Sequence, residues 1–161
     1  MITHLSIKAD IIRCQLSDLN LQDKNLAQSA IDFLSHAYAP YSKFSVSAAA
    51  LLNNGVIVNG TNQENAASPS GTCAERTCLF YANSQYPDIP VSTIAIAAQS
   101  NGQLINNPIT PCGACRQVIL ESEIRFHNQI KIILLAKENC LIINSIKYIL
   151  PLSFDESFLN S

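Results

Sequence analysis

A thiol and a carboxylate lie two residues apart in the segment GTCAERTC, which runs from Gly71 to Cys78. They belong to Cys73 and Glu75, and the glycine before them together with Pro87 after them predicts a helix beginning near this pair. A buried helix favours apolar residues at such positions, and an exposed helix has no use for a thiol. Taken alone, Glu75 is typical of the acidic first turn that a helix dipole favours. Beside a thiol, it indicates proton-transfer chemistry instead.

A second group of thiols lies downstream in PCGAC, from Pro111 to Cys115. Two cysteines separated by two residues at a helix start can hold one metal ion, because both thiolates face the same point outside the first turn. The unpaired amide groups and the dipole of the helix stabilise thiolates there. A redox dithiol is the alternative, but such a pair normally follows the first strand of a thioredoxin-like chain. This pair lies late in the sequence, which favours a metal site.

A tetrahedral zinc site needs more than two protein ligands. The histidines lie outside any motif and are expected to be surface or core residues: His4, His36 and His127. The third ligand would then be one of the remaining cysteines: Cys14, Cys73, Cys78 or Cys140. Cys73 is favoured because it too lies at a helix start, and Cys78 would be about 140° away from it around a regular helix. We therefore expect three thiolates and one open position, which is typical of catalytic zinc.

Zinc in such a site lowers the pKa of a bound water to about 7. A carboxylate beside the metal is suited to carry a proton from that water to a substrate. Residues two apart diverge on a regular helix, so Cys73 and Glu75 share a pocket only if Cys73 lies at the unwound N-terminal edge. We expect Gly71 to permit this arrangement.

The pair CAE and PCGAC matches the zinc-deaminase signature H-x-E with P-C-x-x-C, in the variant where a third cysteine replaces the histidine. The sequence resembles the cytidine deaminase family, in its small form with three cysteine ligands. The likeness covers about three quarters of the chain, in matching order, and the first twenty or so residues lie outside it. The matching stretches are YAPYSKFSVSAA, NQENAA, CAERT, PCGACRQ and LPLSF.

The resemblance implies a zinc site with one Zn²⁺ per chain. Cys73, Cys112 and Cys115 would hold the ion, and Glu75 would be the proton shuttle. Arg76 resembles a residue that hydrogen-bonds the zinc thiolates. Three thiolates give Zn²⁺ a formal charge of −1, which weakens its effect on a bound water, and a neighbouring guanidinium restores part of it.

The resemblance also implies a nucleoside pocket and a homotetramer. Asn62 and Glu64 would hydrogen-bond the ribose hydroxyls, although the sequence alone makes them turn residues after a strand. Phe44 would pack on the pyrimidine, although on sequence alone it is a core residue. The backbone of Ala74 would contact the base, and Phe154 would close the pocket of a neighbouring subunit.

The activity implied is hydrolytic deamination of cytidine and deoxycytidine to uridine and deoxyuridine, in pyrimidine salvage. Activated water would attack C4 of cytosine while Glu75 moves protons to N3 and to the departing amine. The alternatives are a deaminase of the same fold acting on an antibiotic such as blasticidin S, a polynucleotide editor, and a structural zinc module that binds a partner.

The chain departs from the family pattern at two positions. Ser68 stands where relatives often carry an aromatic, and Ser47 replaces a common glycine.

The elements that position these residues alternate in a pattern typical of an α/β protein. We expect helices over 19–39, 71–86, 112–123 and, briefly, 145–154, with a loop over 101–111. Five strands are expected: a hairpin over 44–62 joined at Asn54–Gly55, then 91–100, 130–137 and 140–145. This order predicts a three-layer α/β/α fold with a mixed five-stranded sheet. Residues 1–161 would form a single domain in which residues 1–20 are an N-terminal extension.

The composition is that of a globular protein, with 48% hydrophobic and 14% charged residues. A net charge of −2 provides no basic surface for a nucleic acid. No apolar stretch approaches the roughly 20 residues that cross a bilayer, and the first ten residues lack the apolar core of a signal peptide. We therefore expect a cytoplasmic enzyme with a small-molecule partner, in which Cys14 and Cys140 fill core space.

Overall fold

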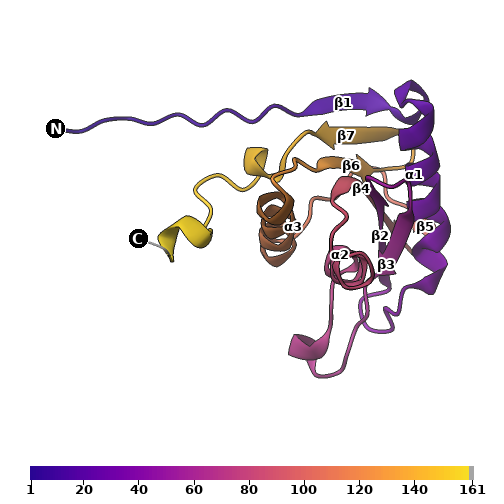
Figure 1. Cartoon of the computed structure of the whole chain (residues 1–161). Helices are drawn as coiled ribbons and strands as arrows, with labels where there is room; N and C mark the ends of the chain where they lie inside the picture. Colours follow the sequence, from indigo (N-terminus) through magenta and orange to yellow (C-terminus); the bar gives the residue numbers. More distant parts are fainter. Residues whose placement is uncertain (160–161) are drawn as a thin grey trace.

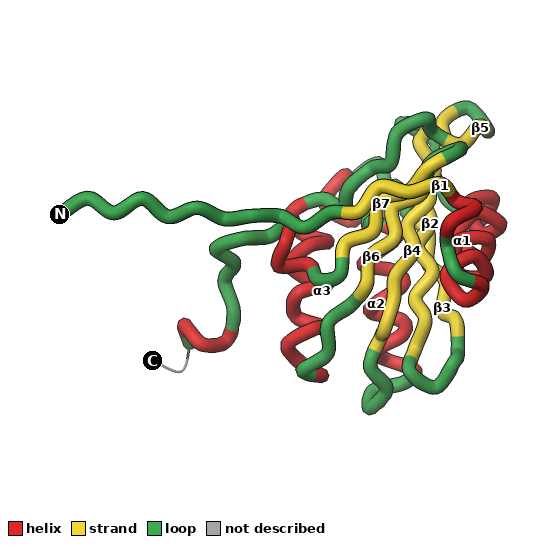
Figure 2. Tube along the Cα trace, turned by 90° about the horizontal axis from the view of Figure 1, so that it is seen from above, coloured by secondary structure: helices red, strands yellow, loops and turns green. Residues whose placement is uncertain are grey.

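The computed structural model describes residues 1–159, and its centre is a seven-stranded sheet (Figures 1 and 2). The strand order is β1-β7-β6-β4-β2-β3, with β5 beside β4. The strands are β1 (Ile12–Gln15), β2 (Phe44–Leu52), β3 (Ile57–Thr61), β4 (Val91–Ser100), β5 (Gln103–Leu104), β6 (Lys131–Leu135) and β7 (Asn139–Ile143). The α-helices are α1 (Leu21–Asp32), α2 (Ala74–Gln85) and α3 (Gly113–Phe126).

The sheet is mixed, because β4 and β6 run parallel and the other neighbours pair antiparallel. The parallel pair is joined by α3, as parallel strands need a crossover connection. The predicted three-layer α/β/α architecture is confirmed, but the prediction of five strands is wrong. The two further strands, β1 and β5, have only four and two residues, too few to show an alternating pattern in the sequence.

Helices cover both faces of the sheet, α1 on one face and α2 with α3 on the other (Figure 1). Alternate residues of β2 divide between the two layers: Ala48 and Ala50 pack against α2, whereas Ala49 and Leu51 pack in the core that α1 covers. The central strands are therefore buried on both sides, which is why their sequences are almost continuously apolar.

The β2–β3 hairpin turns at Asn54–Gly55, as the sequence predicts. Gly55 has φ +85°, a left-handed conformation that glycine adopts without a steric penalty. Leu51 lies opposite Ile57 in the antiparallel register. The hairpin places the residues that follow β3, including the NQEN segment, beside the start of β2.

The helices differ from the predicted ranges mainly at their ends. The first helix begins after Asn20, whose side chain accepts a hydrogen bond from the backbone N–H of Asp23, and it continues from Phe33 as a 3-10 turn. Near the C-terminus, the short helix predicted over 145–154 is a 3-10 helix limited to Ile146–Tyr148, and a further 3-10 helix forms at Glu156–Phe158.

None of the helices within residues 1–159 is long and apolar enough to cross a membrane. Residues 1–11 and residues 151–159 extend away from the sheet on the same side of the molecule (Figure 1).

Candidate active site

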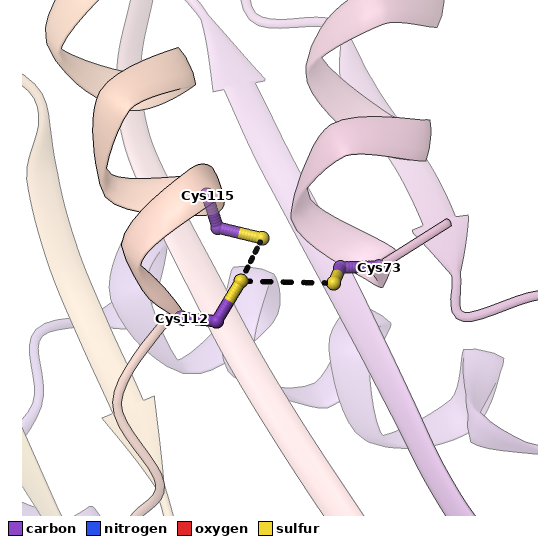
Figure 3. A group of neighbouring side chains, drawn as sticks. All are labelled: Cys73, Cys112 and Cys115. Carbon is purple, nitrogen blue, oxygen red and sulfur yellow. Dashed lines mark hydrogen bonds between the residues drawn. The ribbon is translucent and has the colours of Figure 1, made fainter. Parts of the chain in front are cut away.

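Three thiols from two helix starts converge on one point (Figure 3). Cys73 and Cys112 are the N-cap residues of α2 and α3, and Cys115 lies in the first turn of α3. The Sγ atom of Cys112 lies 3.8 Å from that of Cys73 and 3.4 Å from that of Cys115. The ligand atoms of the three residues all lie within 4.8 Å of one another. The three cysteines that the sequence selects are therefore neighbours in space.

This geometry fits a zinc ion. Tetrahedral zinc with Zn–S bonds of about 2.3 Å separates its sulfur ligands by about 3.8 Å. The Sγ–Sγ distances of 3.8 and 3.4 Å lie close to this value. Three soft thiolates are the ligand type that zinc accepts, and a fourth position is left for a water or a substrate.

Cys78 has no place in the cluster. Its side chain is fully buried in the core under α2, and its thiol donates a hydrogen bond to the carbonyl of Val58 at 3.2 Å. Burial raises the pKa of the Cys78 thiol to about 12. Cys14 and Cys140 pair on neighbouring strands in the core that α1 covers, as the sequence predicts for core cysteines. Within residues 1–159, the three-thiol group is the one cysteine cluster with a metal-binding arrangement.

The three thiols have different electrostatic surroundings. Burial raises the pKa of the Cys73 and Cys115 thiols. Partial burial acts in the same direction on Cys112, but a hydrogen bond from the backbone N–H of Cys115 and hydrogen bonds shared with the neighbouring thiols outweigh it and lower the pKa of Cys112. Because thiolates are the ligands, zinc binding must release protons from Cys73 and Cys115.

Glu75 lies in the first turn of α2 and is 4% exposed. Cys73 has extended backbone angles, φ −79° and ψ 155°, so it stands outside the helix, as the sequence predicts. This is why two residues that would diverge on a regular helix line the same cavity. Gly71 has an ordinary φ of −72°, so the arrangement needs no special glycine backbone conformation there. Burial raises the pKa of the Glu75 carboxyl, and the charge of Arg76 opposes this shift.

The cavity in front of the cluster has a volume of about 690 Å³. Besides Cys73, Cys112 and Glu75, it is lined by four residues to which the family resemblance gives a role: Asn62, Glu64, Ala74 and Arg76. Phe44 begins β2, is half-buried and is not among the lining residues, whereas Val46, on the same face of the strand, is. Ser68 also lines the cavity.

Asn62 and Glu64 are held by the backbone around the start of β2. The Asn62 amide accepts a hydrogen bond from the N–H of Val46 at 2.8 Å and donates one to the carbonyl of Phe44 at 2.9 Å. The Glu64 carboxylate accepts from the N–H of Tyr41 at 2.8 Å. Hydrogen bonds from the Ser42 side chain and the Tyr41 backbone hold the pKa of Glu64 below its usual value. Both side chains are thus fixed at the cavity wall, and Glu64 is ionised.

The guanidinium of Arg76 donates to the carbonyl of Gly71 at 3.5 Å. Its Nε atom is buried, and within residues 1–159 it has no hydrogen-bond partner. Arg76 therefore brings a positive charge to the cavity wall beside Glu75, with donor capacity left over.

Arg116 and Gln117, to which the sequence assigned no role, hold the start of α3 in place. Arg116 donates to the carbonyl of Pro111 at 2.9 Å and to that of Ile149 at 2.7 Å. Gln117 donates to the carbonyl of Phe154 at 2.9 Å. They follow Cys115 directly in PCGACRQ. Polar side chains next to a metal ligand often hold that ligand in position, so the sequence could have predicted a supporting role for them. The first turn of α3 is thereby tied to the C-terminal segment.

Phe154 is 59% exposed. It stacks against Phe158, with ring centroids 5.6 Å apart. Phe154 is thus at the surface of the single chain and outside its own cavity.

The comparisons with known proteins agree with this site. Residues 21–128 match the family model for the cytidine and deoxycytidylate deaminase zinc-binding region. A cytidine deaminase from Halalkalibacterium halodurans is 44% identical over 96 residues, which are 60% of this chain and 68% of the relative. One from Sporosarcina psychrophila is 47% identical over 85 residues, covering 53% of this chain and 58% of the relative.

Solved structures give the same result. A crystal structure of cytidine deaminase from Burkholderia pseudomallei matches with a TM-score of 0.67 and 35% identity, over 81% of this chain and 97% of that chain. A cytidine deaminase from Mycobacterium tuberculosis matches with a TM-score of 0.66 and 28% identity, over 84% and 99% of the two chains.

A three-layer α/β/α fold with three thiols and a buried glutamate at two helix starts defines a zinc-dependent hydrolase. The chain belongs to the cytidine and deoxycytidylate deaminase family.

Proposed function

We propose that this protein deaminates cytidine and deoxycytidine hydrolytically, giving uridine and deoxyuridine, and serves pyrimidine salvage in the cytoplasm. The observation that carries the proposal is the buried carboxylate of Glu75, which lines one cavity together with Cys73 and Cys112 of the three-thiol cluster. We further propose that residues 1–161 act as one domain, because β1 from the N-terminal extension is part of the same sheet as β2 and β4.

In this proposal Cys73, Cys112 and Cys115 hold one zinc ion. Zinc, when bound, lowers the pKa of a water molecule to about 7 and so supplies a nucleophile at neutral pH. Glu75 takes a proton from the attacking water and gives it to N3 of cytosine as the bond to C4 forms. Glu75 then takes the second proton from the hydroxyl group now on C4 and gives it to the amine, so that the C4–N bond breaks, ammonia departs and the C4 carbonyl of uracil forms. A carboxyl whose pKa is raised by burial is suited to both steps, because it holds a proton more readily than an exposed carboxyl does.

The rest of the cavity would bind the nucleoside. Each Asn62 amide atom makes one backbone hydrogen bond, which leaves one N–H and one lone pair for a ribose hydroxyl. Glu64 would accept a hydrogen bond from the sugar. The backbone of Ala74, at the first position of α2, would donate to the base. Phe44 lies outside the lining of this cavity, two residues before Val46 on the same face of β2, so its proposed packing on the pyrimidine requires its side chain to turn toward the cavity.

The test is a substrate panel. The purified zinc-loaded protein is incubated with cytidine, deoxycytidine, cytosine and blasticidin S, and ammonia release is followed. We expect turnover of the two nucleosides and little of the free base, which lacks the ribose that Asn62 and Glu64 would bind. Turnover confined to blasticidin S would assign the antibiotic deaminase instead. No turnover of any of the four by protein containing zinc would favour a structural zinc module.

Arg76→Ala is expected to lower kcat more than it raises KM. Three thiolates leave zinc with a formal charge of −1, and the Arg76 guanidinium is the nearby positive charge that offsets it. Steady-state kinetics with cytidine measure the two constants separately. Arg76→Lys is the matched variant, and we expect it to keep part of the rate because it keeps the charge. A rise in KM with kcat unchanged would make Arg76 a substrate contact.

We also propose that the enzyme is a homotetramer in which Phe154 of one chain closes the pocket of a neighbour. The exposed Phe154 ring lies on a segment whose backbone is anchored to α3 through Gln117, so it is presented in a fixed place. Closing the pocket would exclude water and strengthen the electrostatic interactions on which the reaction depends.

Deleting the chain from Phe154 onward is expected to reduce both the mass in solution and the activity. Sedimentation measures the first and ammonia release the second. A finer pair of variants is Phe154→Ala and Leu152→Ala, both exposed apolar residues of the same segment. We expect only the first to lower activity. A wild-type protein that is monomeric and fully active at dilution would contradict the shared pocket.

A further inference from the structure

The N-terminal arm, which we define as residues 1–11, is an extended segment that leaves the body of the protein (Figures 1 and 2). It precedes β1, the terminal strand of the sheet, and lies outside the family match at residues 21–128. Backbone pairing with β7 begins at Ile12, and within residues 1–159 the backbone of residues 1–10 makes no hydrogen bond to another segment. The arm is therefore a strand-like segment with free donors and acceptors on both edges.

The arm has one apolar face. In an extended chain alternate residues share a face, and the apolar set lies at every second position: Leu5, Ile7, Ala9 and Ile11. The residues between them are polar: Ser6, Lys8 and Asp10. The apolar set is exposed in the single chain, with Leu5 at 86% and Ile7 at 55%. A row of exposed apolar side chains beside an open strand edge is typical of a surface that another strand covers.

The segment Ile7–Lys8–Ala9–Asp10–Ile11 is complementary to itself. When two copies run antiparallel with Ala9 opposite Ala9, Ile7 of each copy lies opposite Ile11 of the other. On the other face Lys8 of each copy lies opposite Asp10 of the other. Within residues 1–159 of the single chain, neither Lys8 nor Asp10 forms a salt bridge. The pairing therefore gives Lys8 and Asp10 of each chain an oppositely charged partner, and it places Ile7 and Ile11 against another apolar side chain.

We propose that the N-terminal arms of two copies of this chain pair as an antiparallel ribbon with a two-fold axis at Ala9. The partner strand is a second copy of this chain, because in the antiparallel register the charges of the arm are complementary to those of an identical arm. A two-fold contact between identical surfaces requires this self-complementarity. The same register places residues 3–5 of the second copy along the free edge of Arg13–Gln15 in β1. Each arm thus covers the open edge of the other chain's sheet.

This contact is independent of the deamination proposal. It involves neither the zinc cluster nor Phe154, and it concerns the part of the chain outside the family match. Cross-strand pairs of opposite charge and of β-branched residues stabilise such a ladder, and like charges placed opposite each other destabilise it.

The first experiment fixes the register with a cysteine in the full-length, zinc-loaded protein. Ala9→Cys places two thiols directly opposite, at the Cβ separation of about 4.5–5.5 Å typical of such pairs. Oxidised glutathione should then link two chains covalently, as seen on a non-reducing gel. Ser6→Cys is the control, because its two copies would lie roughly 20 Å apart along the ribbon at about 3.3 Å per residue. Equal linking at both positions, or none at Ala9→Cys beyond the wild-type level, would overturn the proposal.

The second experiment exchanges the charges in the Ala9→Cys background. Lys8→Asp alone places Asp opposite Asp twice, and Asp10→Lys alone places Lys opposite Lys twice. Each should slow the linking at least about tenfold. The double variant Lys8→Asp/Asp10→Lys restores opposite charges and should return the linking to within about threefold of the parent. A double variant no better than the single ones would overturn the register. Ammonia release from the same samples shows separately whether deamination is intact.

Discussion

Replacing Glu75 by glutamine is expected to lower kcat by at least about 10²–10⁴-fold, the usual contribution of a general acid–base group. Glu75 is 4% exposed and lines the cavity beside Cys73, so the change acts on a buried group at the proposed reaction centre. Glutamine has nearly the same shape but cannot accept and return a proton. A shuttle used twice in each turnover should cost at least as much as one used once.

The fold and the zinc content should survive this substitution. Glutamine has a similar volume and carries no charge. Burial already disfavours the charged form of the Glu75 carboxyl, so its replacement by a neutral group should not destabilise the fold. Circular dichroism and metal analysis on the same sample check this, and steady-state kinetics give the rate. A Glu75→Gln variant within tenfold of the wild type would make Glu75 only an acidic residue of the first helical turn.

Alanine at Cys73, Cys112 or Cys115 is expected to abolish both zinc binding and activity. The three Sγ atoms lie within 4.8 Å of one another, so each removal leaves two thiols, which are too few for a stable tetrahedral site. The wild type should contain one zinc per chain, and each of these variants close to none. Elemental analysis after extensive dialysis measures the metal content.

Cys78→Ala is the matched control, because Cys78 lies in the same helix as Glu75 but packs into the core. It should keep the zinc and most of the activity. Its cost should appear in stability, at about 0.5–3 kcal/mol, since a buried side chain and its hydrogen bond to Val58 are lost. Loss of zinc from this variant would indicate a closed site of four thiolates and no catalytic position.

The site was largely predictable because it depends on short spacings. Cys112 and Cys115 lie three residues apart at one helix start, and Cys73 lies at another, so the geometry of a helix N-terminus brings their thiols to the same side of the sheet. Side chains five residues apart on a helix lie about 140° apart, so the sequence alone separates Cys78 from this group. Local rules of this kind need no knowledge of the tertiary fold.

Other features depend on contacts between distant segments, and the sequence predicted them less well. Residues Ile12–Gln15 form β1 because they pair with β7, with Cys14 opposite Cys140. Four residues are too few to show an alternation of apolar and polar residues that would predict this strand. Arg116 reaches the carbonyl of Ile149, 33 positions away, and only the folded chain reveals this. The layered architecture was predictable because strands such as β6 are apolar on both faces, which requires helices on both sides.

X-ray absorption at the zinc edge distinguishes a catalytic from a structural zinc site, because it counts the sulfur atoms bound to the metal in the purified wild-type protein. We expect three sulfur ligands at about 2.3 Å and one lighter ligand from water in the fourth position. Addition of cytidine should perturb the lighter ligand and leave the sulfur shell unchanged. Four sulfur ligands and no response to the nucleoside would contradict a catalytic zinc site.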